Sequence, residues 1–592
     1  MLATTDIHMN LFGYDYVSDT QGMVAGLAGL SRLISAARAE AAERGMPTIL
    51  LDNGDLLQGS AMGDYLATQP VTSDHPTAAT LRHMRYDAVG LGNHDLDYGL
   101  SYVNAFADAV SIPVISSNLS LSTHTSLVRN AIVFPKSNGH TNADRPQLRV
   151  GVLSVLPAQT AVWNHHVLED NAIVETPSES LSSGARRLRL AGADIIVLLA
   201  HMSIEDANHH SESVEGLLHL SSTPQIDMII AGHTHRRFPN TNHPSREDAD
   251  TITGQLAGRP AIMPGHSGSD LAVLDLTLRH TKDKGWHVAK HQGTLKKNQA
   301  GVKADPCIVS IASPTHEKTR ARLSQPVGQI AWAMHNFFSL AVPTRTCAIV
   351  ASAKARAARE ALVGLAEAKL PLLVTAAAHT AGGRAGPDHY LDIPSGMLLR
   401  RHLSGLCPYA NTIWLLRVDT ETLRLWLEHA AEVYTHLNPD DLNQPLLDPE
   451  IPPFHFDTIY GLTYTIDPTE PVGNRVKALR FQGRPVSTGQ EFLLATNQFR
   501  AAGGGGFPPL HKTRLFLKTH IRTEDAIRRL LSARAKPIWE DHLPWRFSCR
   551  KPVRAVLETT PKALAHLPEI AHFRPQPLAQ SQEGFARIRL TL

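Results

Sequence analysis

Short apolar runs alternate with longer stretches of helical pattern through the first 300 residues, and this alternation most constrains the fold. Runs of four to six apolar residues are typical of strands that are buried on both faces. The alternation of such strands with helices predicts an α/β layered domain. The predicted strands are Thr48–Leu51, Ala88–Leu91, Val150–Val155, Asp194–Leu199 and Asp227–Ala231, and helical patterns cover 27–44 and 178–191.

The pattern changes near residue 300, where a charged and proline-bounded segment follows the last predicted strand of the first domain. We expect a first domain at 1–305, a helical linker or hinge at 306–345 and a second, α+β domain at 346–592. An alanine-rich helix is predicted at 351–369, and the last 75 residues or so show the weakest pattern. The β-like runs of the second domain are Ile413–Val418, Leu462–Ile466 and Phe492–Thr496.

Charge and composition exclude several classes of protein. The 592 residues include 57 Lys and Arg against 55 Asp and Glu, so no basic excess favours a nucleic-acid polymer as partner. No apolar run reaches the roughly 18–20 residues of a membrane span. The four cysteines form no C-x-x-C pair or disulfide framework. The start lacks the basic and apolar regions of a signal peptide, which predicts a cytoplasmic protein, or a periplasmic one if translation starts upstream.

Histidine is abundant, with 32 residues, and several histidines follow the predicted strands directly. The N-terminal segment and four of the strand patterns end in Asp, Asn or His side chains. Open α/β sheets place ligands at the carboxyl ends of their strands, so these side chains should meet at one edge. Carboxylate, amide and imidazole groups bind borderline divalent metals. The residues are Asp6, His8, Asp55, Asn93, His94, His201, His233 and His235.

Seven of these residues, all except His94, are candidate ligands, and this number favours two metal ions over one because it exceeds what one tetrahedral site uses. Asp55 follows a glycine turn in the central motif, and we expect its carboxylate to bridge the two ions, as is usual for metal pairs about 3.5–4 Å apart. Each short cluster of Asp, Asn or His residues is by itself weak evidence for a metal site. Because all of the clusters directly follow successive predicted strands, chance does not explain the pattern. The role of His266, in a Pro-Gly-His-Ser-Gly segment, stays open.

This ordered set of motifs resembles the calcineurin-like metallophosphoesterases and, more narrowly, the 5′-nucleotidase family. Within that family it is most similar to the branch of bifunctional 2′,3′-cyclic-nucleotide 2′-phosphodiesterase/3′-nucleotidases. The resemblance implies a four-layer β-sandwich flanked by helices and a C-terminal α+β substrate-binding domain. The stretches that carry it are 3–16, 51–67, 90–100, 198–203, 231–239 and 261–276.

The resemblance also implies roles for the residues. It implies that the cofactors of this protein would be two divalent metal ions, among Mn, Zn, Co and Fe. His94, oriented by Asp97, would act near the leaving oxygen, where an imidazolium can donate a proton. One ion would take Asp6, His8, Asp55 and His235, and the other would take Asp55, Asn93, His201 and His233.

Substrate recognition is expected in the second domain. In the resembled family two aromatic side chains enclose the base, and the matching positions are Tyr409 and Phe499. Arg384 matches a substrate-contacting arginine, a residue type suited to phosphate. The 5′-nucleotidases carry an acid in the glycine loop where this chain has Gly505 and Gly506. This difference favours the cyclic phosphodiesterase branch and leaves ribose recognition unassigned.

The sequence therefore predicts a dimetal hydrolase with a small-molecule nucleotide substrate. It would open 2′,3′-cyclic nucleotides to 3′-nucleotides and then release the 3′-phosphate. A 5′-nucleotidase, a nucleotide-sugar hydrolase or a thiosulfohydrolase is the main alternative, and a non-catalytic nucleotide-binding protein is a remote one. A site shared between domains would require bending of the linker, near 310–345.

Overall fold

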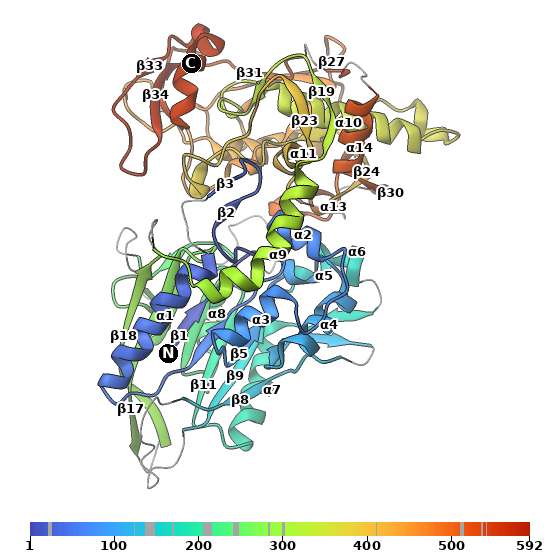
Figure 1. Ribbon diagram of the computed structural model, residues 1–592. Coiled ribbons are helices and arrows are strands. Elements are labelled where there is room, and N and C mark those ends of the chain that lie inside the picture. The colour runs from blue at the N-terminus through green and yellow to red at the C-terminus, as the bar shows by residue number, and fades with distance from the viewer. Residues whose placement is uncertain are drawn as a thin grey trace. The chain divides into compact units, whose positions relative to one another are not determined.

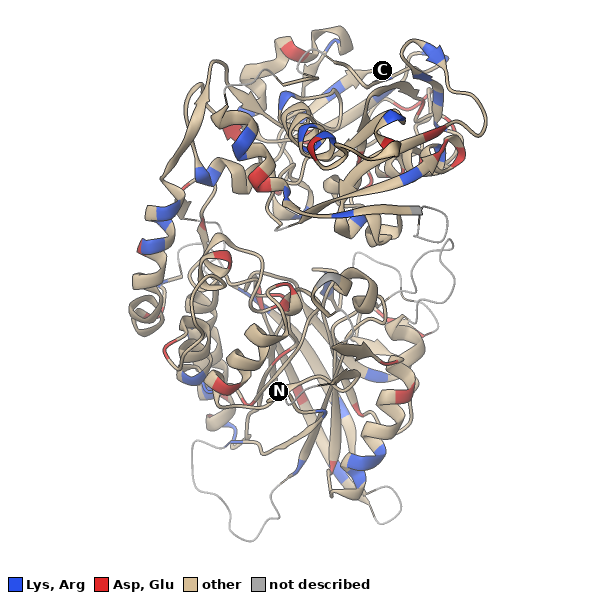
Figure 2. Ribbon diagram, turned by 90° about the vertical axis from the view of Figure 1, so that its right-hand side faces the viewer, with Lys and Arg blue, Asp and Glu red and all other residues tan. Residues whose placement is uncertain are grey.

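The computed structural model divides the chain into two compact units, Met1–Ala321 and Arg322–Leu592, which we describe one at a time (Figure 1). Along the ribbon of each unit, basic and acidic residues are interspersed among the described residues (Figure 2). The structure describes residues 1–21, 26–122, 125–136, 148–168, 171–204, 216–240, 245, 248–281, 285–298, 302–409, 411–508, 514–533, 537–539 and 542–592.

Two sheets form the centre of the first unit. The first has the order β18-β17-β1-β4-β5-β6, and the second has the order β14-β15-β16-β12-β11-β9-β8, with β13 also paired to β16. The strands of the first sheet are β18 (Gly285–Lys297), β17 (Asp270–Thr281), β1 (Leu2–Thr4), β4 (Leu50–Asp52), β5 (Ala88–Gly90) and β6 (Val114–Ile115). Those of the second are β14 (Ala249–Asp250), β15 (Gln255–Leu256), β16 (Arg259–Pro264), β12 (Met228–Ala231), β11 (Ile195–Ala200), β9 (Val150–Val155), β8 (Ala131–Val133) and β13 (Arg237–Phe238).

Strand β11 shows why the central strands are apolar along their whole length. Successive side chains of a strand point to opposite faces. Val197 and Leu199 pack against residues of the first sheet such as Leu51. Leu198 faces the other way, among helix residues such as Leu181. The strand is therefore buried on both faces, as the apolar runs predict.

Helices cover the outer faces and complete four layers (Figure 1). Helices α7 and α8 pack on the second sheet, and α1 lies against β17 of the first. This arrangement confirms the predicted four-layer α/β sandwich. The helices of the unit are α1 (Gly26–Glu43), α2 (Ala61–Leu66), α3 (Pro76–His83), α4 (Leu100–Val110), α5 (Thr160–Trp163), α6 (His165–Leu168), α7 (Pro177–Leu190), α8 (Leu217–Ser221) and α9 (Pro306–Leu323).

The parallel strands of both sheets end at one level. In the first sheet Thr4 pairs with Asp52, so β1 and β4 end together. In the second, Ala200 pairs with both Val155 and Ala231. The residues that follow these strand ends are therefore delivered to one edge of the sandwich.

A mixed five-stranded sheet, β25-β21-β29-β24-β30, lies in the second unit. Smaller sheets β28-β27-β26-β31 and β32-β34-β33 share with it one core, which includes Trp426, Phe492 and Trp545. The main strands are β21 (Leu372–Ala376), β24 (Thr412–Asp419), β25 (Thr458–Tyr460), β26 (Leu462–Ile466), β27 (Val476–Phe481), β28 (Arg484–Pro485), β29 (Glu491–Asn497), β30 (Arg514–Arg522), β31 (Trp545–Phe547), β32 (Arg554–Thr559), β33 (Gln576–Pro577) and β34 (Ala586–Thr591). Helices α10 (Arg345–Ala361), α11 (Arg400–Leu406), α12 (Thr420–Ala430), α13 (Gln498–Ala501) and α14 (Thr523–Ser532) complete it.

Two details differ from the sequence prediction. The alanine-rich helix begins at Arg345, six residues before its predicted start, because Thr344 and Pro343 mark its entry. It ends at Ala361, and a separate 3₁₀ turn covers Ala366–Lys369. The final residues, whose pattern is weak, form β31 to β34. Within the described parts of the chain, every helix is too short or too polar to cross a bilayer.

The buried face of β11 gives a stability test. Leu198 is fully buried, and we expect Leu198→Ala to lower the free energy of unfolding by about 2–5 kcal/mol, because it leaves a cavity in a packed core. Leu190, at 82% exposure on α7, is the matched control and should change little on truncation to Ala. Urea unfolding followed by circular dichroism measures both variants. Equal effects of the two substitutions would contradict the assigned packing.

Candidate metal and catalytic site

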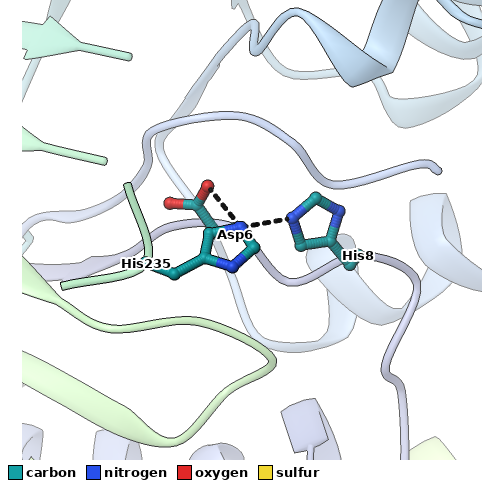
Figure 3. Close-up of side chains that lie close together, drawn as sticks. All are labelled: Asp6, His8 and His235. Carbon is teal, nitrogen blue, oxygen red and sulfur yellow. Dashed lines mark hydrogen bonds and ion pairs between the residues drawn. The ribbon is translucent and has the colours of Figure 1, made fainter. Parts of the chain in front are cut away.

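Asp6, His8 and His235 converge at the edge where the parallel strands end (Figure 3). Asp6 and His8 follow β1, and His235 follows β12. The Nε2 atoms of His8 and His235 lie 2.9 Å apart, and Nε2 of His235 lies 3.5 Å from a carboxylate oxygen of Asp6. Three donor atoms, from two segments that are 227 residues apart, therefore lie close together.

Asp55, His201 and His233 form a second group beside the first. His201 Nε2 lies 3.0 Å from Asp55 Oδ2 and 3.8 Å from Asp6 Oδ1. His8 Nε2 lies 3.9 Å from the same Asp55 oxygen. Asp55 therefore stands between the two groups, in the position that a bridging ligand needs.

Hydrogen bonds from the far side of two imidazole rings fix their tautomers. Nδ1 of His8 donates to the carbonyl oxygen of Gln58 at 2.8 Å. Nδ1 of His201 donates to the carbonyl oxygen of Asn53 at 2.9 Å. Each ring therefore turns its Nε2 atom toward the carboxylates, which is the orientation typical of metal-bound histidines.

Several polar atoms at this site are buried and have no hydrogen-bond partner within the described structure. They are Asp55 Oδ2, His201 Nε2 and the side-chain oxygen of Asn93. The 3.0 Å contact between Asp55 and His201 is an ion pair whose atoms are not aligned as a hydrogen bond. Unpaired buried acceptors are costly unless another group satisfies them. A cation among these atoms would satisfy all three.

The charges of the site point to the same conclusion. Burial favours a neutral Asp55, yet His201, His94 and His8 outweigh burial and hold its pKa well below the usual range. Burial lowers the pKa of His201, but Asp55 and Asp6 outweigh burial and raise it to about 10. A proton thus occupies a place among carboxylates that a divalent cation can take.

The backbone at the site is strained. Asp6, His8, Asp55, His233 and His235 all have positive φ, between 50° and 71°. Residues other than glycine seldom adopt this region, and such strain persists where the surrounding structure imposes it for a function. The tight backbone turns the side chains off the strand direction, so that residues such as Asp6 and His8 reach one point.

Two glycines allow the loops to approach the carboxylates. A Cβ atom on Gly92 would lie 2.1 Å from Asp55 Oδ1. A Cβ atom on Gly232 would lie 2.3 Å from Thr5 Oγ1 and 2.8 Å from Asp6 Oδ2. Glycine is therefore required at both positions for close packing of the site.

His94 and Asp97 form a hydrogen-bonded pair next to Asp55. His94 Nδ1 donates to Asp97 Oδ2 at 2.9 Å, and the His94 backbone N–H donates to Asp55 Oδ1 at 2.8 Å. Burial lowers the pKa of His94, but Asp97 and Asp55 outweigh burial and raise it to about 9. The pair therefore keeps an imidazolium stable near neutral pH.

Asn164 and Asp95, which are not among the predicted site residues, support this site. Asn164 Nδ2 donates to Asp97 Oδ1 at 2.8 Å and to the Asn93 carbonyl oxygen at 3.1 Å. The Asp95 carboxylate accepts bonds of 2.8–2.9 Å from the backbone N–H groups of Gly92, Asp55, Leu56 and Leu57. Asp95 thereby joins the loop after β5 to the loop after β4. The sequence signal that could have identified Asp95 is the Gly-Asn-His-Asp motif at 92–95, of which it is the last residue.

Two further aromatic rings stack on the histidines of the site. Trp163 stacks on His233 at a centroid distance of 5.5 Å. His266, whose role the sequence left open, stacks on His235 at 4.6 Å. Both contacts restrict the imidazole orientations.

The residues expected to bind substrate lie in the second unit. Tyr409 lies edge-on against His379, with centroids 5.7 Å apart. A Cβ on Gly504 would lie 2.6 Å from the Phe499 ring, so the glycine loop packs directly on that ring. Arg384 is exposed and forms an ion pair with Glu450. No contact between these three residues is described, and their roles stay predictions.

Comparison with known proteins relates both units to one family. The calcineurin-like phosphoesterase family matches residues 1–237, and the 5′-nucleotidase C-terminal domain matches residues 321–512. The 2′,3′-cyclic-nucleotide 2′-phosphodiesterase/3′-nucleotidase of Haemophilus influenzae is 30% identical over 100% of this chain and 94% of that protein.

A longer relative and a solved structure agree with this relationship. The trifunctional nucleotide phosphoesterase YfkN of Bacillus subtilis is 31% identical over 86% of this chain, but this chain spans only 36% of YfkN. A crystal structure of a candidate 5′-nucleotidase from Staphylococcus aureus shares the fold, with a TM-score of 0.71 and 19% identity, covering 93% of this chain and 99% of that one. The chain therefore belongs to the calcineurin-like phosphoesterases that carry a 5′-nucleotidase C-terminal domain.

Proposed function

We propose that this chain is a metal-dependent phosphoric ester hydrolase. It opens 2′,3′-cyclic nucleotides to 3′-nucleotides and then removes the 3′-phosphate to give a nucleoside and inorganic phosphate. The observation that carries the substrate class is the similarity, along the whole chain, to the Haemophilus influenzae enzyme of that name. The convergence of Asp6, Asp55 and His201 at one edge supports the hydrolytic chemistry.

The donor set fits two divalent cations. We assign Asp55 to both ions, because its carboxylate lies between the two groups. Bound there, the ions would polarise the phosphoryl oxygens and promote ionisation of a water molecule near neutral pH. Mn, Zn, Co and Fe all accept such nitrogen and oxygen ligands. The first ion would take Asp6, His8, Asp55 and His235, and the second would take Asp55, Asn93, His201 and His233.

His94 supplies the proton for the leaving oxygen in this proposal. Its Nδ1–H is held by Asp97, so the proton that it can transfer is on Nε2. Asn164 fixes the opposite oxygen of Asp97 and prevents that carboxylate from turning away. The ring therefore keeps one orientation during the reaction.

We assign nucleoside recognition to residues 346–592 and the phosphoester chemistry to residues 1–305, joined by the linker at 306–345. Tyr409 and Phe499 carry aromatic rings of the kind on which a base stacks, each stack contributing roughly 1–3 kcal/mol. Arg384 would bind phosphate after leaving Glu450.

A substrate panel tests the proposed function. Purified protein supplied with Mn²⁺ or Co²⁺ should convert 2′,3′-cyclic AMP to 3′-AMP and release inorganic phosphate from 3′-AMP. Chromatography of the nucleotides and a phosphate assay measure the two steps. A higher kcat/KM for 5′-AMP or a sulfur ester would favour the alternative hydrolases, and tight nucleotide binding without turnover would indicate a receptor.

Replacement of the central carboxylate tests the metal assignment. We expect Asp55→Asn to lose both bound metal and activity, because it removes the charge shared by the two ions. Metal analysis after dialysis and the phosphate assay measure the two losses. Asp74→Asn, at an exposed position of the same unit, is the control and should retain both. Full metal content in Asp55→Asn would refute the bridging role.

The pH profile tests the pair of His94 and Asp97. Below its pKa, His94 carries the transferable proton, so the rate should fall as the pH rises through that pKa. Asp97→Asn removes the carboxylate that raises this pKa and should move the alkaline limb of kcat/KM to lower pH. His94→Ala should keep metal and lose about 10²–10⁴-fold in rate. A lower rate in Asp97→Asn with an unmoved alkaline limb would argue against the proton-donor role.

A further inference from the structure

The second unit contains a further cluster of side chains of the kind that bind metal ions. Among the described residues, His429, Glu432 and His455 each offer one donor atom, and these atoms lie within 4.8 Å of one another. The groups at the catalytic edge meet the same limit. Two imidazoles and a carboxylate are a ligand set that zinc accepts, with a further position for water.

The local fold places these side chains together. His429 lies in the last turn of α12, and Glu432 follows three residues later in a 3₁₀ turn, Ala431–Val433. Residues three apart on a helical segment face the same side. His429 Nδ1 lies 3.2 Å from Glu432 Oε1, close to the spacing of about 3.3 Å between ligands of a tetrahedral ion with 2.0–2.1 Å bonds. His455 ends the 3₁₀ turn Pro453–His455, and its ring centroid lies 4.5 Å from that of His429.

A backbone carbonyl oxygen accepts a hydrogen bond from Nε2 of each imidazole. His429 Nε2 donates to the carbonyl oxygen of Gly505 at 2.8 Å. His455 Nε2 donates to the carbonyl oxygen of His429 at 3.0 Å. In neutral rings these bonds leave both Nδ1 atoms unprotonated. Burial lowers the pKa of His455 well below its usual value, which keeps that ring neutral. This is the tautomer and support that metal-bound histidines show.

Two buried arginines, Arg475 and Arg500, lie near the cluster. Burial lowers the pKa of Arg475, and Glu428 and then Glu432 act against that shift, so Glu432 contributes to the compensation of Arg475. Arg500 Nε lies 3.5 Å from Asp457 Oδ2. The same guanidinium donates to the carbonyl oxygens of Gly504 and Phe454, at 2.9 Å each. The Glu432 carboxylate is therefore not needed to neutralise Arg500.

The other such cluster of this unit lacks this support. His335 Nε2 lies 3.0 Å from Glu569 Oε1 and 3.1 Å from His566 Nδ1. However, Nδ1 of His335 is buried without a hydrogen-bond partner in the described structure. A metal on Nε2 would require a proton on that Nδ1 and so would bury an unpaired donor, which is costly. This cluster is the natural control.

We propose that His429, Glu432 and His455 bind a divalent transition-metal ion of the zinc type that is separate from the catalytic pair. The ion would also stiffen the glycine loop, because His429 holds the carbonyl of Gly505. The rings of His429 and His455 pack on Phe507, which follows that loop, at centroid distances of 4.8 and 5.1 Å. The site therefore links metal binding to the loop beside Phe499.

Metal stoichiometry tests this proposal in the full-length protein. After equilibrium dialysis against Zn²⁺, the parent should bind three ions per chain and Glu432→Gln should bind two. Glu569→Gln, in the control cluster, should bind three. The Glu432→Gln change preserves shape, and no backbone hydrogen bond to the Glu432 side chain is described. Equal zinc content in the parent and Glu432→Gln, or a loss in Glu569→Gln, would overturn the proposal.

A second measurement separates this site from the catalytic one. In the Asp55→Asn background, Zn²⁺ at about 100 times its Kd should raise the Tm by about 5 °C, because the ion binds only the folded state. Adding Glu432→Gln should abolish that shift. If the catalytic assignment fails but this one holds, Glu432→Gln still lowers the zinc content by one ion. A zinc-dependent shift that survives Glu432→Gln would refute the site.

Discussion

The first unit depends on the burial of two carboxylates, Asp6 and Asp55, at the edge of a sandwich whose interior is apolar. Buried carboxylates are stable only when hydrogen bonds and opposite charges compensate for the loss of water. Asp55 Oδ1 accepts the His94 backbone N–H, while its Oδ2 faces His201 without a hydrogen bond. That incomplete compensation creates a need for a cation at this position. The strained backbone turns the side chains toward this position, and Gly92 and Gly232 let the loops approach the carboxylates closely.

Sheet geometry determines which residues can take part. Parallel strands begin and end in register, so the polar residue after each strand reaches the same edge. The paired ends of β9, β11 and β12 at Val155, Ala200 and Ala231 show this register directly. Each strand must also be apolar on both faces, because the sandwich and the helices cover them. The same constraint therefore produces the apolar runs and the cluster of donors.

This constraint explains how much could be predicted from the sequence. The central strands were predictable because burial on both faces leaves only apolar residues, and the donor residues were visible because they follow those strands. Asn164 and Trp163 were not, because they lie in a short helical segment after β9 with no periodic pattern of their own. Asp95 could not be predicted for another reason: three of its four backbone contacts are made to residues on a neighbouring loop. Tertiary hydrogen bonds of this kind leave little trace in a single sequence.

In the second unit, too, features that depend on tertiary contacts could not be predicted from the sequence. Strands β24, β26 and β29 were predictable from their apolar runs, whereas the final strands were not. Strand β34 alternates apolar with polar residues instead of forming an apolar run. Its Ile588 and Leu590 are buried because a long-range partner, β32, lies beside them. His429 and His455 lie in helical turns and not at strand ends, so the sequence pattern alone could not indicate a site there. His429 and His455 gain significance only from the carbonyls that orient them. Imidazole chemistry is set by the partner of the second ring nitrogen. For this reason a histidine count indicates metal binding only after the fold has shown where each second nitrogen points.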